Sequence, residues 1–273
     1  MSATAFICAT CGTQHAPSLA PPAACAICED PRQWVPAAGQ TWTTTEALAR
    51  RHAVGWREGA PGLLGCGLFP DFAIAQRALL LRTPAGNVLW DCIALLDPAT
   101  IAIVKALGGI RAIAISHPHY YAAMVDWAQA FDCPVLLHAA DRQWVMRPDP
   151  AIRFWEGEAH HMLPGVTLHR LGGHYAGGTI LHWAEGQGAI LTGDIASVTP
   201  DRRHVSFMWS FPNWVPLPAA EVARMGAVLE ALHFDAVYGA WWDRVIPTGG
   251  KAAVQASVAR YIRAVSGPGP LGP

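Results

Sequence analysis

The apolar and polar positions of the chain predict two runs of short strands, each mixed with helices. The first run starts at Phe72, where two apolar segments separated by a turn at residues 84–87 predict a hairpin that ends at Cys92. The other elements predicted for this run are a helix from Asp97 to the glycines at 108 and 109, a strand over 110–116, a helix over 122–131 and a strand over 134–138. Ahead of this run, residues 41–70 show one short helical pattern and then a loop rich in glycine and proline.

The second run occupies the C-terminal half of the chain. Its predicted elements are strand segments at 165–173, 177–194 and 235–241, an aromatic loop at 197–216, and helices at 218–232 and 251–265. Two runs of strands with interspersed helices indicate two sheets whose outer faces are covered by helices. We expect one domain over residues 41–267, preceded by a distinct segment at 1–40 and followed by a disordered tail at 268–273.

The N-terminal segment lacks strand or helix periodicity but contains a regular set of cysteines. Cys8, Cys11, Cys25 and Cys28 form the pattern C-x2-C-x13-C-x2-C. Two such pairs can supply four thiolates to one tetrahedral ion, at about 2.3 Å per zinc–sulfur bond. Because the segment has almost no hydrophobic core, we expect a structural zinc ion to stabilise it as a knuckle. Four ordinary buried thiols are the alternative.

The composition limits the classes of function. Of the 273 residues, 52% are hydrophobic and only 14% are charged, so a large buried core is expected and disorder is excluded. The net charge of −1, and the acidic Glu29 and Asp30 beside the cysteines, argue against nucleic-acid binding. The longest apolar stretch, residues 101–116, is interrupted by two glycines and two basic residues, so no membrane-spanning helix is predicted. The absence of a visible secretory signal and the odd number of cysteines favour reduced thiols in a soluble, cytoplasmic protein.

Three histidines and one aspartate follow apolar strand segments, which is where site residues usually gather. His117 and His119 come directly after the predicted strand 110–116, while His174 and Asp194 follow later strand segments. Two imidazoles at positions i and i+2 of a turn can bind one ion together. Histidine nitrogens and a carboxylate suit zinc, and they also suit iron. The four residues therefore predict a metal site, although the H-x-H pair alone is a weak signal.

The motifs SHPHYY, GGHYAGGT and LTGD, with the earlier segment VLWDC, occur in the order and spacing of the metallo-β-lactamase-fold hydrolases. The chain resembles this superfamily over roughly residues 70–245. The resemblance implies an α/β fold, an αββα four-layer sandwich, with a metal site at the edge between its two sheets. It also implies that His117, His119 and His174 hold the first metal and that Asp194 is the carboxylate that bridges two metals in the family.

The chain departs from the family pattern at the second metal site. Where the family has His-x-His-x-Asp-His, this chain has Tyr121 at the Asp position and Ala122 at the last His position. A further family histidine is replaced within the segment 238–242. We therefore expect one active-site ion, zinc or iron, instead of two. His182 could substitute for a lost ligand, but a packed or solvated strand residue is the favoured interpretation.

The retained residues suggest how one ion would act. Such an ion polarises a carbonyl group and lowers the pKa of water to about 7. Asp194 would complete the coordination or orient water as a general base. Tyr120 or Tyr121 would donate a hydrogen bond to a developing oxyanion, unless both only pack. Asp91, at a strand end, is interpreted as a support for the site loops.

These observations predict a metal-dependent hydrolase of an ester, lactone, thioester or amide. Aromatic residues in the segment 205–214 and at Trp241 and Trp242 favour an apolar or aromatic small-molecule substrate, or else they pack the knuckle onto the domain. Two alternatives stay open: a non-catalytic ligand- or protein-binding module on the same fold, and an iron-dependent oxidoreductase. A second copy of the chain, in a homodimer, is a further candidate partner, whereas nucleic acid and membrane are not.

Overall fold

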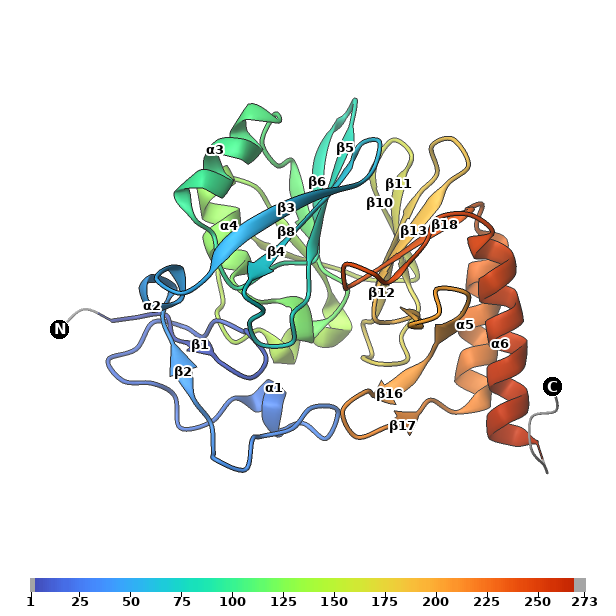
Figure 1. The fold of residues 1–273 in the computed structure, drawn as a ribbon, viewed down its shortest axis with the longest axis horizontal. Helices are drawn as coiled ribbons and strands as arrows, with labels where there is room; N and C mark the ends of the chain where they lie inside the picture. Colours follow the sequence, from blue (N-terminus) through green and yellow to red (C-terminus); the bar gives the residue numbers. More distant parts are fainter. Residues whose placement is uncertain (1–2, 268–273) are drawn as a thin grey trace. The chain divides into compact units, whose positions relative to one another are not determined.

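A computed structural model describes residues 3–267 of the chain, which divides into two compact units, Met1–Trp155 and Glu156–Pro273 (Figure 1). The cysteine-bearing N-terminal segment belongs to the first unit. Its separation from the rest of the chain as a distinct segment at 1–40 stays a prediction. The tail predicted at 268–273 lies outside the described residues.

The first unit begins with the cysteine ribbon, the name used below for residues 4–43. Its regular structure is short: strand β1 (Ile7–Cys8) pairs antiparallel with β2 (Trp42–Thr43), and helix α1 (Ala26–Glu29) lies between them in the sequence. Helix α2 (Thr45–Ala49) follows the ribbon. Most of the ribbon is therefore turn and loop, as expected for a sequence without periodicity.

A seven-stranded sheet forms the centre of the first unit, in the order β3-β4-β5-β6-β7-β8-β9. Strands β3 to β6 pair antiparallel, whereas β6 to β9 pair parallel. The strand bounds are β3 (Ala53–Ala60), β4 (Leu63–Phe69), β5 (Ala78–Thr83), β6 (Gly86–Trp90), β7 (Ala112–Ala114), β8 (Val135–His138) and β9 (Ile152–Trp155). Because parallel strands end at the same edge of a sheet, the residues that follow β6 and β7 lie close together.

Two α-helices and two 3₁₀ helices connect the parallel strands. They are α3 (Pro98–Ala106), η1 (Pro118–Tyr120), α4 (Met124–Phe131) and η2 (Ala139–Trp144). The side chain of Asp97 accepts a hydrogen bond from the N–H of Thr100, so α3 begins at the predicted cap, and it ends before the predicted glycines. Helix α4 packs against β7 and β8 and occupies the predicted segment.

The structure differs from the prediction in the segment that precedes residue 84. Residues 53–69, expected as a loop, form the hairpin β3–β4, and β5 begins at Ala78 instead of Phe72. Strand β3 lies at the edge of the sheet with no buried residue, so its sequence lacks the apolar alternation of a strand. Ala73 and Ala75 have φ angles of 52° and 57°, a left-handed conformation that ends the extended segment early.

The second unit contains a six-stranded sheet in the order β10-β11-β12-β13-β18-β19, in which only β13 and β18 pair parallel. Its strands are β10 (Ala159–Leu163), β11 (Val166–Arg170), β12 (Thr179–Trp183), β13 (Ala189–Gly193), β18 (Ala236–Gly239) and β19 (Val245–Ile246). The predicted aromatic loop forms two short antiparallel pairs, β14 (Ser197–Val198) with β15 (Val205–Ser206), and β16 (Met208–Ser210) with β17 (Val215–Pro216).

Helices α5 (Ala219–Ala231) and α6 (Gly250–Ser266) pack side by side against this second sheet (Figure 1). Val222, Met225 and Leu229 lie three and four residues apart on α5 and are buried with apolar residues of β12, β13 and β18. Both helices occupy the segments predicted for them. The buried residues of the helices stabilise the sheet that contains β13, the strand directly before Asp194.

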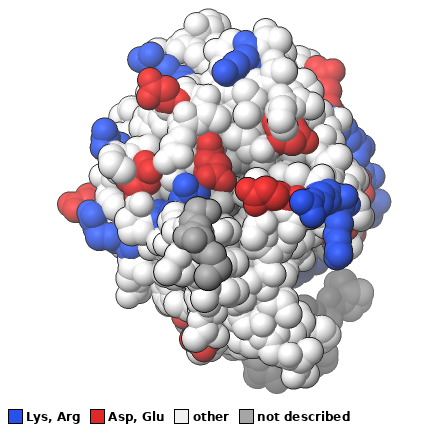
Figure 2. All heavy atoms as spheres, turned by 90° about the vertical axis from the view of Figure 1, so that its left-hand side faces the viewer, with Lys and Arg blue, Asp and Glu red and all other residues white. Residues whose placement is uncertain are grey.

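The surface and the helices bear on possible partners. Within residues 3–267, no helix is both long and apolar enough to cross a membrane. Figure 2 shows one face of the molecule, on which charged groups are sparse and both signs are interspersed. No large area of a single sign is visible on that face, which agrees with the net charge of −1.

Candidate metal centres

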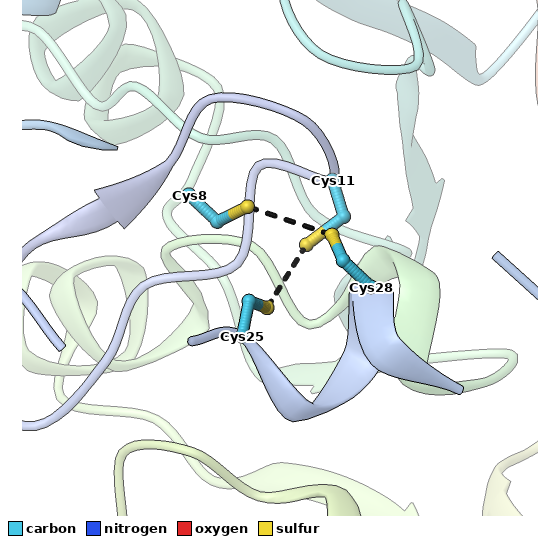
Figure 3. A group of neighbouring side chains, drawn as sticks. All are labelled: Cys8, Cys11, Cys25 and Cys28. Atoms are coloured by element: carbon cyan, nitrogen blue, oxygen red, sulfur yellow. Dashed lines mark hydrogen bonds between the residues drawn. The ribbon is translucent and has the colours of Figure 1, made fainter. Parts of the chain in front are cut away.

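Four cysteine sulfurs converge on one point in the first unit (Figure 3). Cys8 lies on β1 and Cys11 in the turn after it, while Cys25 caps the N-terminus of α1 and Cys28 lies within that helix. The four sulfur atoms lie within 4.8 Å of one another, with Cys8 3.6 Å from Cys28 and Cys11 3.7 Å from Cys25. All four side chains are buried. This arrangement is the one that four-thiolate binding of a single ion requires.

Hydrogen bonds among the four cysteines lower the pKa of the Cys8 and Cys25 thiols and raise the pKa of the Cys11 and Cys28 thiols. The side-chain Nε2 of Gln40 donates to the Cys8 sulfur at 3.0 Å, and its Oε1 accepts from the backbone N–H of Cys25 at 3.3 Å. A hydrogen bond with Cys11 contributes most to lowering the pKa of the Cys8 thiol to about 7. Apolar residues enclose the rest of the cluster: Ile27, Trp42, Trp144 and Met146. Such donors and such enclosure are typical of the residues around structural metal sites.

His117 and His119 lie in the turn that follows β7. The 3₁₀ helix η1 brings their ring centroids to 5.0 Å, and one ring nitrogen of each lies within 4.8 Å of the other. Both side chains are buried, with exposed fractions of 1% and 2%. The two imidazoles are therefore close enough to bind one ion together.

Asp91 and Ser116 orient the ring of His117. Strands β6 and β7 are parallel and in register, so Asp91 at the end of one lies beside Ser116 at the end of the other. The backbone N–H and the hydroxyl of Ser116 both donate to Asp91 Oδ1, at 2.8 Å and 2.7 Å, and Ser116 Oγ lies 2.9 Å from Nδ1 of His117. Burial raises the pKa of Asp91 to about 7, although the two hydrogen bonds from Ser116 oppose this shift. Asp91 thus has the supporting contact expected from its place at a strand end.

Tyr120 and Tyr121 are buried beside the histidine pair, and the ring of Tyr120 lies 4.5 Å from that of His117. Their role as hydrogen-bond donors to an oxyanion stays a prediction. The next residue, Ala122, has a φ of 40°, which is strained for alanine. Its carbonyl oxygen accepts a hydrogen bond from the backbone N–H of Gln14 at 3.1 Å. The position at which the family has a histidine is therefore a strained alanine that contacts the ribbon.

His174 lies in the second unit, in a glycine-rich turn that follows β11. Gly173 has a φ of 77°, and a Cβ there would come within 2.9 Å of Leu217 and Met225, so only glycine fits this close approach. Nδ1 of His174 lies 2.8 Å from the carbonyl oxygen of Trp209, on β16. The predicted aromatic loop thus contacts a candidate ligand directly, and the ring of Phe211 lies 5.7 Å from that of His174.

Asp194 follows β13 in the same unit and is buried. One of its carboxylate oxygens lies within 4.8 Å of a ring nitrogen of His174. The neighbouring parallel strand β18 ends at the same edge, where the N–H of Ala240 donates to the carbonyl of Gly193 at 3.1 Å. Trp241 and Trp242 follow Ala240, so the segment that lacks the family's last histidine begins next to Asp194.

His182 has the strand role favoured by the sequence. It lies on β12, and its Nε2 is 2.7 Å from the carbonyl oxygen of His233. Ser116 and Gln40 were not predicted as site residues, although each contacts a candidate ligand. Ser116 directly precedes His117, so a hydroxyl at that position was a usable signal. Gln40 lies 32 residues from Cys8, and no local pattern identifies it.

One curated relative establishes the family of the chain. The chain is 46% identical over 266 residues to the uncharacterized protein YmaE of Bacillus subtilis (strain 168), in a match that covers 96% of this chain and 97% of YmaE. The chain belongs to the YmaE family. No family model matches it.

Solved structures identify the fold of this YmaE-family chain. VMB-1 aligns with a TM-score of 0.59 at 8% identity, over 78% of this chain and 98% of VMB-1. The metallo-β-lactamase FIM-1 from Pseudomonas aeruginosa, in its mono-zinc form, aligns with a TM-score of 0.57 at 14% identity, over 79% of this chain and 97% of FIM-1. A B3 metallo-β-lactamase with an active-site glutamic acid aligns with a TM-score of 0.54 at 16% identity, over 87% and 96% of the two chains. The predicted resemblance and α/β fold class are confirmed: the chain has the metallo-β-lactamase fold.

Proposed function

We propose that this YmaE-family protein is a metal-dependent hydrolase whose single catalytic ion is bound by His117, His119, His174 and Asp194. The observation that carries the proposal is the orientation of two imidazoles. Nδ1 of His117 and Nδ1 of His174 each contact an oxygen of the protein, so Nε2 is the atom that each ring would offer to a metal. All four residues are buried and are of types that can hold a metal ion.

The fold and the order of the motifs support a single ion at this place. His117 and His119 follow β7, and His174 follows β11. Asp194 follows β13, which completes the order of the superfamily motifs. Tyr121 and Ala122 replace two ligands of the second metal site. FIM-1, which shares the fold, has been solved in a mono-zinc form, so the fold accommodates one zinc ion.

Each residue of the site has a role in the proposed hydrolysis. When bound, the ion supplies a Lewis acid that polarises a carbonyl oxygen and lowers the pKa of water to about 7. Asp194 orients the attacking water and accepts its proton, which then passes to the leaving oxygen, sulfur or nitrogen as the acyl bond breaks. The hydroxyl groups of Tyr120 and Tyr121 donate to the oxyanion. Asp91, through Ser116, holds the ring of His117.

The substrate class follows from the aromatic residues around His174 and Asp194. The segment 207–214 contacts His174, and Trp241 and Trp242 follow the strand next to β13. Aromatic side chains bind apolar or aromatic groups with little loss of conformational entropy. We therefore propose an ester, lactone, thioester or amide with an apolar or aromatic group as the substrate.

The four cysteines would hold a second, structural ion. Four thiolates leave no open coordination position, so this ion takes no part in the chemistry. Zinc is the metal we propose here, because soft thiolate ligands in a tetrahedral set favour it. Zinc or iron would suit the histidine site. A cytoplasmic location and a homodimer stay predictions.

Counting metal ions per chain tests the proposal. Elemental analysis of the wild type should give two ions, and His119→Ala should give one. The matched control is His182→Ala, which removes a strand histidine and should keep both ions. A single ion in the wild type that survives His119→Ala would overturn the histidine site. If the site is confirmed, turnover of aryl esters, lactones, thioesters, amides and a β-lactam should be found in the wild type and lost in Asp194→Asn.

A non-catalytic binding module is the second candidate, and the replacement of family ligands by Tyr121 and Ala122 favours it. A wild type that holds both ions, binds an apolar ligand and hydrolyses none of the five substrate classes would support this candidate. Iron at the histidine site, found in the same elemental analysis, would instead support the iron-dependent oxidoreductase.

A further inference from the structure

We propose that the cysteine ribbon is a clasp that positions the loop carrying His117 and His119, and that Gln14 is the positioning residue through which it acts. The metal-binding role of that loop rests on the proposed function. The ribbon itself, its contacts and the loop all lie within the first unit.

The backbone of the ribbon leads directly from the cysteines to the histidine loop. The N–H of Cys8 donates to the carbonyl of Thr13 at 2.9 Å, which closes the turn that carries Cys11. The next residue, Gln14, donates its N–H to Ala122, and the N–H of Ala16 donates to Met146 at 3.0 Å. Only two residues separate Cys11 from Gln14, so the geometry of the cysteine turn determines where Gln14 meets the loop.

The side chain of Gln14 makes a second, buried attachment. It is only 3% exposed, and its Nε2 donates to Asp126 Oδ2 at 2.8 Å. Arg147 donates both to Oε1 of Gln14 and, at 2.6 Å, to Asp126 Oδ1. Asp126 lies in the first turn of α4, directly after the loop. Gln14 thus contacts the end of the histidine loop through its backbone and the following helix through its side chain.

The loop needs such support because it is strained at the point of contact. Ala122 has a φ of 40°, and a strained residue persists only where its surroundings hold it. Ala122 is three residues from His119, so relaxation of its backbone would move an imidazole. An error of about 1 Å in a ligand position is enough to weaken a metal site.

An ion on the four cysteines would therefore act at a distance. It would fix the turn that carries Cys11, that turn would fix Gln14, and Gln14 would hold Ala122 and Asp126. Loss of this ion should loosen the histidine loop without any change in the loop itself. The ribbon would make the affinity of the histidine site depend on the state of four thiols.

Hydrogen exchange tests the clasp without reference to catalysis. The amides of residues 117–124 should exchange about tenfold faster in Gln14→Ala than in the wild type, since loss of about 1.4 kcal/mol of local stability corresponds to that factor. The matched control is Gln129→Ala, which removes another Gln–Asp hydrogen bond, to Asp149, from the exposed side of α4. Equal exchange in the two variants would overturn the proposal.

Metal binding supplies the second readout. Gln14→Ala should keep the ion of the four cysteines and bind zinc at the histidine site about 10–100-fold more weakly, as measured by competition with a chromogenic chelator. Cys25→Ser should lose the first ion and weaken the second to a similar degree. Unchanged affinity of the histidine site in Gln14→Ala would contradict the clasp. Failure of the proposed function is a different result: the wild type would then hold no ion at the histidines, while the exchange experiment would still decide whether Gln14 holds the loop.

Discussion

The carboxylate of Asp91 and the ring of His117 are joined through a single hydroxyl group, that of Ser116. The hydroxyl donates its one proton to Asp91 at 2.7 Å, so its oxygen is left to accept from Nδ1 of His117 at 2.9 Å. This chain of two hydrogen bonds selects the imidazole tautomer with the proton on Nδ1, in which Nε2 carries the lone pair that a metal needs. The sheet itself brings Asp91 and Ser116 together, because the parallel strands β6 and β7 end side by side.

Removing the hydroxyl should therefore weaken metal binding at the histidines. In Ser116→Ala we expect the dissociation constant for zinc at this site to rise about 10–100-fold, because the ring of His117 loses its orienting partner. Competition with a chromogenic chelator measures this dissociation constant. Ser257→Ala is the control, since Ser257 is an equally buried hydroxyl, 1% exposed, that accepts from the backbone of Val205 in the second unit. Equal affinities in both variants would show that Ser116 does not orient the ring.

The cysteine site gives a prediction about stability. Cys28→Ser should remove one zinc ion per chain and lower the free energy of unfolding by about 4 kcal/mol, because loss of a structural metal is among the most damaging single changes. Cys133→Ser changes another buried cysteine of the same unit that lies outside the cluster, and it should keep the ion. Elemental analysis measures the zinc content, and denaturant unfolding measures the free energy of unfolding. An unchanged zinc content in Cys28→Ser would leave four ordinary buried thiols as the better description.

Local signals in the sequence predicted the four longest helices, α3 to α6, and the strands β5 to β8, β11 to β13 and β18, but not the strands β3, β4, β9 and β10. Helix α3 has a capping aspartate, a proline at its first position and glycines after its end, and it forms where these residues place it. The hairpin β3–β4 was missed because its signal is not local. Strand β3 is stabilised by pairing with β4 along an edge, and its side chains stay partly exposed, so no apolar pattern marks it.

The candidate ligands could be found because they follow apolar strands in a recognisable order. Of their supports, Asp91 was identified from its place at a strand end, and Ser116 could have been, because it directly precedes His117. The others could not. The hydrogen bond from Gln14 to Asp126 joins residues 112 positions apart, and a contact of that range depends on the packing of the whole unit. The sequence likewise shows that Ala122 replaces a family ligand, but only the backbone angle shows that this alanine is strained.

His169 makes the stability of the second unit depend on pH. Burial first, and then the nearby His182 and His161, lower the pKa of His169 from 6.5 to about 4. At pH values between about 4 and about 6.5, His169 is protonated in the unfolded chain and neutral in the folded chain. The free energy of unfolding therefore falls as the pH falls from about 6.5 to about 4. Because the side chain is only half-buried, we expect His169→Gln to recover only about 1 kcal/mol of this loss.

Urea unfolding of the wild type and of His169→Gln at several pH values measures that difference. The two proteins should differ little in their pH dependence above pH 7, where the histidine is neutral in both states. The curves should separate only in the acid window. If the two curves stay parallel down to pH 4, the histidine does not have the lowered pKa.

The turn between β12 and β13 contains two left-handed glycines with different surroundings. Gly186 has a φ of 63° with nothing within 4 Å of a Cβ placed on it, whereas Gly188 has a φ of 73° and its Cβ would lie 2.3 Å from the carbonyl oxygen of His233. Gly186→Ala should therefore cost about 1 kcal/mol of unfolding free energy, the usual penalty for a left-handed alanine. Gly188→Ala should cost about 4 kcal/mol, because the backbone of residues 233–234 must move as well. Denaturant unfolding of the two variants separates the effect of backbone strain from that of close packing. Similar losses of unfolding free energy would mean that backbone strain alone determines this turn. A larger loss for Gly188→Ala would mean that close packing at the start of β13 also contributes.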